Sequence, residues 1–203
     1  CGLKKQSRDN ETAQGNVDRP TRLWYNGFHQ SREPRRMEEG ALTMKLQYLG
    51  TAAAEAIPAL FCHCETCRRA RLNGGKDIRG RSGLVVNDTA LIDFPPDIYM
   101  TSLRFGIDLG LLRDIFITHS HEDHFDLQEL GMRENGVYCH LGEHDDAPGI
   151  RLYGNDGVKK LAEEYRRAVN ATFFTFTELE YGQSCRAENG VVFPFLPARH
   201  MDT

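Results

Sequence analysis

Long hydrophobic runs are missing from this chain of 203 residues. A helix that crosses a membrane needs roughly 18 consecutive apolar residues, and no stretch of the sequence approaches that length. The sequence also shows no secretory leader with a charged start and an apolar middle. We therefore expect no membrane partner and a location in the cytoplasm.

A strong excess of charge is missing as well. The formal net charge is -4 at pH 7 and the isoelectric point is about 6.1. Proteins that bind nucleic acid or anionic membranes commonly show a basic balance, so we do not expect a nucleic-acid partner. The length suits one domain with its own core, and the function has to be sought in a local site.

Apolar residues are scarce before residue 44. Residues 1–43 contain eight Lys or Arg, six Asp or Glu and only 11 apolar residues, without periodicity. Such a segment cannot bury enough surface to offset its ordering entropy. We expect residues 1–43 to be a disordered extension and residues 44–203 to be the domain. Three origins are open for the first residue, Cys1: a fragment, a processed product, or the lipid-modified cysteine of a lipoprotein.

Strands and helices are predicted in alternation from residue 44 onward. The apolar Met44, Leu46 and Tyr48 alternate with polar residues, which predicts a strand over 44–48 with these three side chains facing the core. Strands interleaved with one-faced helices favour a layered α/β (α+β) fold. The other predicted elements are a hairpin of 83–86 and 91–94 around Asn87–Asp88, helix 97–105, strand 114–118, a short helix capped by Asp126, strand 150–153, helix 155–169, and strands 171–176 and 191–196.

Three of the eight histidines fall within the short motif T-H-S-H-E-D-H, directly after an apolar run. His119 and His121 are two residues apart, so in an extended segment both side chains can bind one metal ion. Asp123 and His124 follow one turn later and can bind a second ion. Two ions about 3.5–4 Å apart can activate a shared water for hydrolysis. A polar loop with incidental histidines is the alternative, which the spacing disfavours.

The same motif resembles the signature of the metallo-β-lactamase fold superfamily. This resemblance implies a four-layer αββα sandwich with two catalytic metal ions at one edge, zinc ions by the nature of the ligands, with manganese or iron as alternatives. It makes Asp123 a catalytic candidate as well as a ligand. L-I-D, ending at Asp93, resembles the family's first motif, whose aspartate supports the metal loop by hydrogen bonding; a plain turn residue is the alternative. F-L-P-A-R-H resembles the third motif and implies that His200 completes the first metal site.

Three of the six cysteines are clustered as Cys62, Cys64 and Cys67. Three thiolates at this spacing can occupy three corners of a tetrahedral zinc site, and three free thiols are the alternative. The surrounding sequences L-G-T-A-A-A-E-A-I-P and F-C-H-C-E-T-C-R-R-A-R resemble the branch typified by the phosphodiesterase of the carbon–phosphorus lyase pathway. In that branch such a loop binds a structural zinc, with a histidine near the C-terminus as fourth ligand.

A basic stretch follows the cysteines. Its arginines suit phosphate oxygens, although a solvated face is an equally good reading. The stretch favours a phosphate ester as substrate without establishing one. Its cations, set against the single acid Asp77, are Arg68, Arg69, Arg71, Lys76, Arg79 and Arg81.

The resemblance runs from about Met44 to the end of the chain, and it leaves ligands unaccounted for. The family supplies a metal-bridging aspartate, a last histidine and the fourth ligand of the structural zinc well after the third motif. We expect these residues beyond position 203, in a domain truncated at its C-terminus.

The leading functional hypothesis is a metal-dependent hydrolase, most similar to a phosphodiesterase that uses a metal-bound hydroxide at a dinuclear site. The expected partners are a small-molecule phosphate ester and a second copy of the chain in a homodimer. One alternative is hydrolysis of another ester, a lactone or RNA on the same fold. The other is a metal-binding fragment without catalytic activity.

Overall fold

The computed structural model describes three parts of the chain: residues 44–134, 136–142 and 149–198. The chain divides into two units, Cys1–Glu39 and Gly40–Thr203, and all described residues belong to the second unit. The extension predicted over 1–43 and the predicted ligand His200 both lie outside the described residues.

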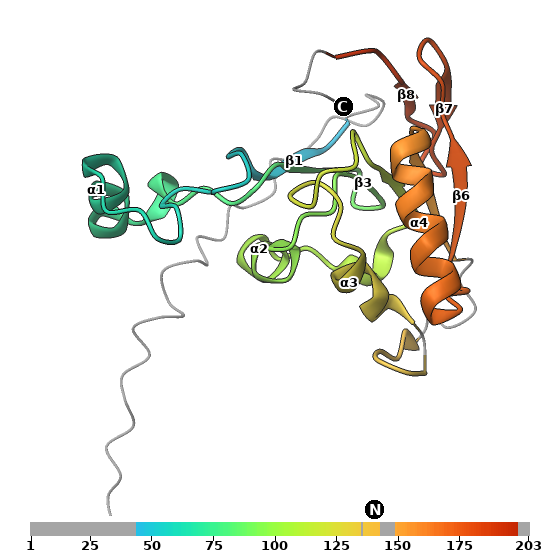
Figure 1. Ribbon diagram of the computed structural model, residues 1–203, viewed down its shortest axis with the longest axis horizontal. Helices are drawn as coiled ribbons and strands as arrows, with labels where there is room; N and C mark the ends of the chain where they lie inside the picture. Colours follow the sequence, from blue (N-terminus) through green and yellow to red (C-terminus); the bar gives the residue numbers. More distant parts are fainter. Residues whose placement is uncertain (1–43, 135, 143–148, 199–203) are drawn as a thin grey trace, which may run out of the picture. The chain divides into compact units, whose positions relative to one another are not determined.

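A six-stranded sheet forms the centre of the second unit (Figure 1). The first two strand pairs are antiparallel and the remaining three are parallel, so every strand except β2 runs in the same direction. The carboxyl ends of these strands therefore meet at one edge of the sheet. In the order in which they lie, the strands are β1 (Leu46–Gly50), β2 (Gly83–Val86), β3 (Ala90–Ile92), β4 (Asp114–Phe116), β5 (Ile150–Gly154) and β6 (Phe174–Glu178).

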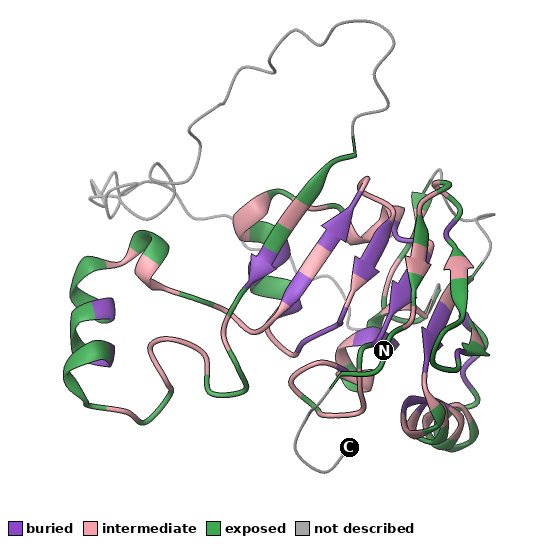
Figure 2. Cartoon of the chain, turned by 90° about the horizontal axis from the view of Figure 1, so that it is seen from above, coloured by how far each residue is buried: buried purple, intermediate pink, exposed green. Residues whose placement is uncertain are grey.

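Helices cover one face of this sheet. Leu91, Ile115 and Leu152 point from the central strands into a buried cluster with residues from α2 (Ile98–Phe105), α3 (Leu127–Leu130) and α4 (Asp156–Val169). Burial is concentrated in these strands (Figure 2). None of the helices in the described part of the chain is long and apolar enough to span a membrane.

A hairpin covers part of the opposite face. Its strands are β7 (Ser184–Arg186) and β8 (Val192–Pro194). Phe193 stacks on Phe116 of the sheet with ring centroids 4.2 Å apart, and Phe116 in turn stacks on Tyr153 at 4.6 Å. The helices, the sheet and the hairpin thus form three successive layers, which confirms the predicted layered α/β class.

The predicted hairpin, the helix after Pro96 and the long amphipathic helix are all present in the structure. Asn87 and Asp88 have φ values of 49° and 62°, the left-handed backbone that a tight turn requires and that Asn and Asp tolerate. Asp126 caps α3 by accepting from the amides of Gln128 and Glu129. The sequence did not predict α1 (Glu65–Asn73) or β7.

The predicted orientation of the first strand is wrong. Met44, Leu46 and Tyr48 are 56%, 49% and 64% exposed, whereas Leu49 is 2% exposed and lies in the helix-covered core. Alternation along a strand shows that two faces differ, but it does not show which face is covered. Here β1 is the edge strand of the described sheet, and its apolar alternate positions lie on the face that the helices do not cover.

Gly50 ends β1 where the chain passes close to residues 80 and 81. The amides of Thr51 and Ala52 both donate to the carbonyl of Gly80, at 3.1 and 3.0 Å. A Cβ atom on Gly50 would collide with the backbone carbonyl oxygens of Gly80 and Arg81, which cannot rotate away as a side chain would.

Gly50→Ala should therefore lower the free energy of unfolding by roughly 2–3 kcal/mol, the usual cost of forcing a backbone shift. The matched control is Gly83→Ala on the neighbouring strand, because a Cβ atom there meets only ordinary contacts of 3.6 Å and more. Urea denaturation of both variants measures the difference. Equal stability of the two variants would contradict the close approach at Gly50.

Candidate metal centre

The histidine motif lies at the edge where the carboxyl ends of the parallel strands meet. Strands β3 and β4 are hydrogen-bonded neighbours, so the residues that follow them emerge side by side. The amide of Asp93 donates to the carbonyl of Phe116 at 2.9 Å, and the amide of Phe94 donates to the carbonyl of His124 at 2.8 Å. The chain after β3 and the loop after β4 are therefore joined through their backbones before any side chain is considered.

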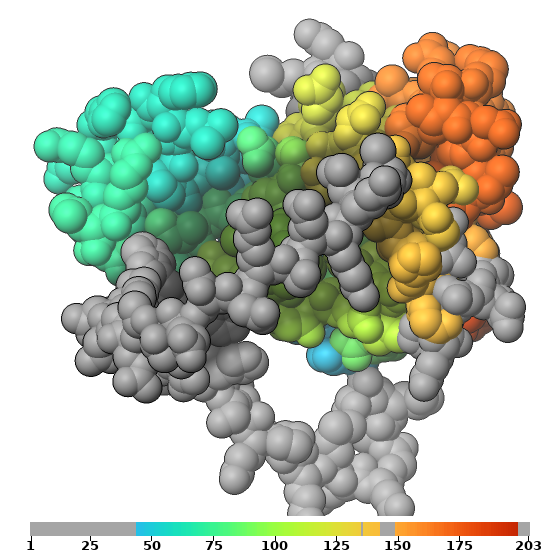
Figure 3. Space-filling view, turned by 90° about the horizontal axis from the view of Figure 1, so that it is seen from below, coloured from blue at the N-terminus to red at the C-terminus, as the bar shows by residue number. Residues whose placement is uncertain are grey.

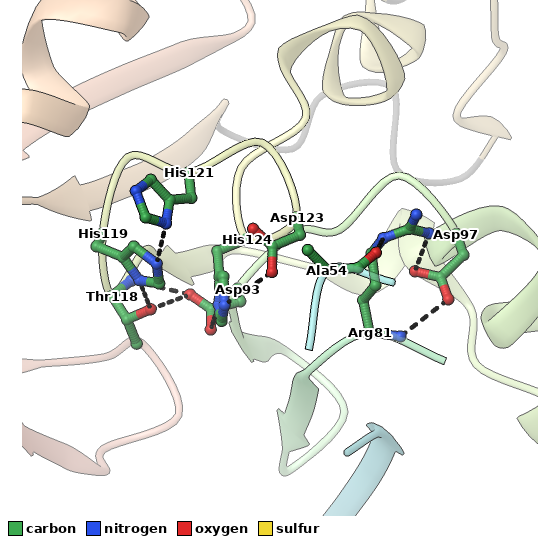
Figure 4. Close-up of polar contacts among 9 residues, drawn as sticks. All are labelled: Ala54, Arg81, Asp93, Asp97, Thr118, His119, His121, Asp123 and His124. Carbon is green, nitrogen blue, oxygen red and sulfur yellow. Dashed lines mark hydrogen bonds and ion pairs between the residues drawn. The ribbon is translucent and has the colours of Figure 1, made fainter. Parts of the chain in front are cut away.

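Asp93 connects the two segments through its side chain (Figure 4). The residue is 3% exposed and has φ +62°, a backbone conformation that Asp adopts more readily than most residues. Its Oδ1 accepts from the amide of Thr118 at 2.9 Å and from the Thr118 hydroxyl at 2.8 Å. Its Oδ2 lies 2.7 Å from Nδ1 of His124. One buried carboxylate thus fixes both ends of the motif.

These contacts determine which nitrogen of each ring carries a proton. A carboxylate only accepts, so His124 carries its proton on Nδ1 and turns Nε2 away from Asp93. The Thr118 hydroxyl donates to Asp93 and lies 3.0 Å from Nδ1 of His119, from which it can accept. His119 and His124 are both left with Nε2 as the nitrogen that can bind a metal.

The candidate ligands form two close pairs. Nε2 of His119 lies 3.2 Å from Nδ1 of His121, and Nε2 of His124 lies 3.4 Å from Oδ2 of Asp123. The rings of His119 and His124 lie next to each other, with centroids 4.1 Å apart. Imidazole nitrogens and a carboxylate oxygen are donors that zinc, manganese and iron accept, so the chemistry of these side chains suits such metals. The two-ion arrangement stays a prediction.

The environment of His124 favours its protonated form. The hydrogen bond to Asp93 raises the pKa of His124, burial opposes this, and the charges of Asp93 and Asp123 add to the increase. A proton and a metal ion compete for the same nitrogen. Metal affinity at the pair formed by Asp123 and His124 should accordingly fall as the pH drops below this raised pKa.

The three cysteines gather around the start of α1. Among the described residues, they are the group of three metal-binding side chains whose ligand atoms all lie within 4.8 Å of one another. Cys64 occupies the N-cap of α1 and Cys67 is buried in its first turns. Arg71 holds the preceding loop in place by donating to the carbonyls of Cys62 at 2.6 Å and Ala59 at 2.8 Å.

The thiols differ in acidity. Hydrogen bonding from the Cys67 backbone, with side-chain hydrogen bonds from Cys62 and Cys67, lowers the pKa of Cys64 to about 7. For Cys67 the Ala59 amide lowers the pKa, but burial and the neighbouring sulfurs outweigh it and raise the pKa. A site with one readily formed thiolate among three clustered sulfurs suits a soft divalent ion such as zinc.

Zinc binding at this cluster should stabilise the chain. At free zinc about 100 times the dissociation constant, binding adds roughly 2.7 kcal/mol to the free energy of unfolding. In Cys64→Ala we expect most of this increase to disappear, whereas Cys139→Ala should keep it because Cys139 lies outside the cluster. Thermal unfolding with and without zinc measures the difference. An equal zinc response of the two variants would mean that the cysteines do not bind the metal.

The six cations of the basic stretch have different roles in the structure. Arg71 supports the cysteine loop, and Arg81 donates from Nε to the carbonyl of Ala54 at 2.8 Å while its amide donates to Asp97 at 3.0 Å (Figure 4). These two arginines therefore serve the local structure. Arg68 and Arg69 are exposed on α1. The basic stretch does not act as one surface.

Sequence reasoning did not single out Thr118. Its position directly before His119, where a hydroxyl can bridge a buried carboxylate and a ring nitrogen, was the available signal. The predicted ligand His200 is outside the described residues, so the third ligand of the pair formed by His119 and His121 remains a prediction.

The described residues have the metallo-β-lactamase fold. A crystal structure named as a new diphosphatase from the PhnP family superposes with a TM-score of 0.57 at 20% identity, over 72% of this chain and 55% of that one. Zinc-bound PqqB from Methylobacterium extorquens superposes with a TM-score of 0.59 at 18% identity, over 76% of this chain and 56% of that one. At such identities the likeness shows the fold alone, and this chain spans little more than half the length of either structure.

Comparison of sequences adds one shorter match. An octanoyltransferase of Porphyromonas gingivalis is 34% identical over 85 residues, which are 40% of this chain and 16% of that protein. So small a share of that protein gives no ground for assigning octanoyl transfer to this chain. No family model matches the sequence.

Proposed function

We propose that this chain is the metal-binding part of a hydrolase that cleaves phosphodiesters at a dinuclear centre. The observation that carries the proposal is the Asp93 carboxylate, which orients Thr118 and His124 at the sheet edge beside two pairs of metal-binding side chains. His119 and His121, with His200, are proposed to hold one ion, and Asp123 and His124 the other.

The metal ions, when bound, lower the pKa of water and stabilise negative charge on a phosphate ester. The residues of the chain orient the metal ligands and hold the histidine loop in place. In the neutral rings, Asp93 directs the proton to Nδ1 of His124 and, through the Thr118 hydroxyl, to Nδ1 of His119, so that Nε2 of each ring is the nitrogen available to a metal ion. The buried carboxylate also holds the loop in place, so that little reorganisation is needed when ligands bind.

Two features support a phosphate ester over other esters. The cysteine cluster with its surrounding sequence resembles the phosphodiesterase branch of the fold, and a similar solved structure is named as a diphosphatase of the PhnP family. We propose zinc at the cysteine cluster as a structural ion, and zinc, manganese or iron at the histidine loop. A small-molecule substrate fits the absence of an overall basic charge.

The proposal is tested by hydrolysis assays with the chain loaded with zinc or manganese. The probes are bis(p-nitrophenyl) phosphate, a p-nitrophenyl carboxylic ester and a lactone, each assayed with the unaltered chain and with His121→Ala. We expect hydrolysis of the phosphodiester alone, and its loss in the variant. Hydrolysis of the lactone or carboxylic ester without the phosphodiester would keep the hydrolase and refute the substrate class. No hydrolysis of any probe would favour a metal-binding fragment without activity.

A further inference from the structure

Two thiols of the cysteine cluster differ in their access to solvent. Cys64 is exposed, whereas Cys67 is 6% exposed and its sulfur accepts from the amide of Ala59 at 3.4 Å. Both lie at the start of α1, which extends beyond the sheet edge formed by β1 (Figures 1 and 3). Apart from Cys67, the only buried residue of this helix is Ala70. A reagent in solution can therefore reach the sulfur of Cys64 but not that of Cys67.

The spacing of these two cysteines suits a disulfide bond. They are the ends of the sequence C-E-T-C. The amide of Arg68 donates to the carbonyl of Cys64 at 2.9 Å, which closes the first turn of α1 around both cysteines. Side chains three residues apart on a helix lie on one face with Cβ atoms about 5–6 Å apart, and a disulfide joins residues at a similar spacing. The two sulfurs already lie within 4.8 Å of each other.

The third sulfur of the cluster has a different position in the chain. Cys62 lies before the helix, on a segment whose backbone is held by Arg71, since the guanidinium donates to the Cys62 carbonyl at 2.6 Å. The closed turn of α1 therefore brings together Cys64 and Cys67 and does not include Cys62. Two exposed arginines, Arg68 and Arg69, follow on the helix, and their charge attracts an anionic reagent.

We propose that Cys64 and Cys67 form a thiol–disulfide exchange pair, which glutathione disulfide oxidises with release of the zinc proposed for this cluster. The Cys64 sulfur first attacks one sulfur of glutathione disulfide, whose sulfur–sulfur bond breaks as one glutathione leaves. The Cys67 sulfur then attacks the Cys64 sulfur and displaces the second glutathione. Each cysteine proton passes through water to a departing glutathione, and the two electrons that the cysteines lose are gained by glutathione disulfide.

Zinc and the disulfide compete for the same sulfurs. A cysteine binds zinc as a thiolate, so oxidation of Cys64 and Cys67 removes two of the three clustered ligands. The cluster therefore releases zinc under oxidising conditions and binds it again after reduction. The pair goes beyond the proposed function because hydrolysis plays no part in it, although the release step rests on the zinc proposed for this cluster.

The test is oxidation of the full chain, as purified with its zinc, in oxygen-free buffers with a rising share of glutathione disulfide. Mass spectrometry of the alkylated peptide that contains residues 62–67 measures the disulfide, and a chromophoric chelator measures the zinc released. We expect a disulfide between Cys64 and Cys67, with about one zinc ion released for each disulfide, as for one tetrahedral site. Excess dithiothreitol should reverse both changes. A chain treated with a chelator beforehand is oxidised in parallel, so that a missing metal is distinguished from a missing thiol pair.

Serine variants assign the two sulfurs. Cys67→Ser should stop at a mixed disulfide between Cys64 and glutathione, and Cys64→Ser should form neither product. Cys62→Ser should still form the disulfide, as should the matched control Cys139→Ser, which alters a cysteine outside the cluster.

Four results would each overturn the proposal. They are no disulfide in either form of the unaltered chain, a disulfide that forms without loss of bound zinc, loss of the disulfide in Cys62→Ser, and an internal disulfide that forms in Cys67→Ser as readily as in the unaltered chain. The last two results would assign the exchange to Cys62 in place of Cys67.

Discussion

Asp93→Ala should lower the affinity of the histidine loop for zinc by about ten- to a hundredfold, the range seen when residues that orient metal ligands are removed. Three hydrogen bonds end on this carboxylate, two from Thr118 and one from His124. Without it, His124 can take either tautomer and Thr118 no longer fixes His119. Zinc titration against a chromophoric chelator measures the change, with the cysteine site saturated beforehand.

The variant Asp93→Asn removes the negative charge of this side chain while it keeps the shape of the side chain. The amide keeps an oxygen for Thr118, and Asn tolerates the positive φ that Asp93 adopts. Its NH2 group would face Nδ1 of His124, which drives the proton onto Nε2, the nitrogen needed for the metal. We expect a near-normal free energy of unfolding with weakened zinc binding, and a changed tautomer in nitrogen NMR spectra. Unaltered zinc affinity in both variants would show that Asp93 does not orient the ligands.

Asp114→Ala should lower the free energy of unfolding by about 3 kcal/mol, because it leaves the donors around a buried carboxylate without their acceptor, although the Arg151 side chain is 38% exposed and can be hydrated. Asp114 is fully buried at the start of β4. Its carboxylate accepts from Arg151 at 2.7 Å, from the Tyr153 hydroxyl at 3.2 Å and from the amide of Glu188 at 2.8 Å. These bonds connect β4 to β5 and to the turn of the β7–β8 hairpin. Their loss should therefore destabilise both the sheet and the packing of the hairpin on it.

The pKa values of its partners reflect the same network. The hydrogen bond to Asp114 raises the pKa of Arg151, while burial raises the pKa of Tyr153, with the Asp114 charge adding to the effect. Both Arg151 and Tyr153 therefore keep their protons throughout the neutral range.

The control for this prediction is Lys45→Ala. Lys45 makes a short ion pair with Asp88 at 2.6 Å, but both side chains are about half exposed, and such pairs contribute little to stability. Guanidinium denaturation compares the two variants. If Asp114→Ala were no less stable than Lys45→Ala, the buried network would not hold the layers together. Zinc binding at the histidine loop should survive both changes, because Asp114 lies at the opposite end of β4.

Local patterns predicted the elements whose signals are complete within a short stretch. The turn at Asn87–Asp88 and the apolar spacing of α4 both gave elements that the structure contains. The failures are of a different kind. The helix α1 was missed because its cysteines and arginines give no apolar periodicity, and its buried residues are only Cys67 and Ala70. The facing of β1 depends on which layers cover the sheet, which no local pattern contains.

In the candidate metal centre, too, the residues within one short motif were predicted from the sequence pattern, whereas the contacts between distant segments were not. Spacing alone pointed to His119, His121, Asp123 and His124 as ligands from one loop. Asp93 came only from the resemblance, because 25 residues separate it from Thr118 and the hydrogen bonds between them exist only after β3 and β4 pair.

The most direct test of the account is the zinc content of the purified chain, measured by elemental analysis for the unaltered protein, His121→Ala and Cys64→Ala. The account predicts that each variant loses a separate share of the zinc, one share belonging to the histidine loop and the other to the cysteine cluster. Zinc content unchanged by His121→Ala would contradict the central claim, since the histidine loop would then hold no metal.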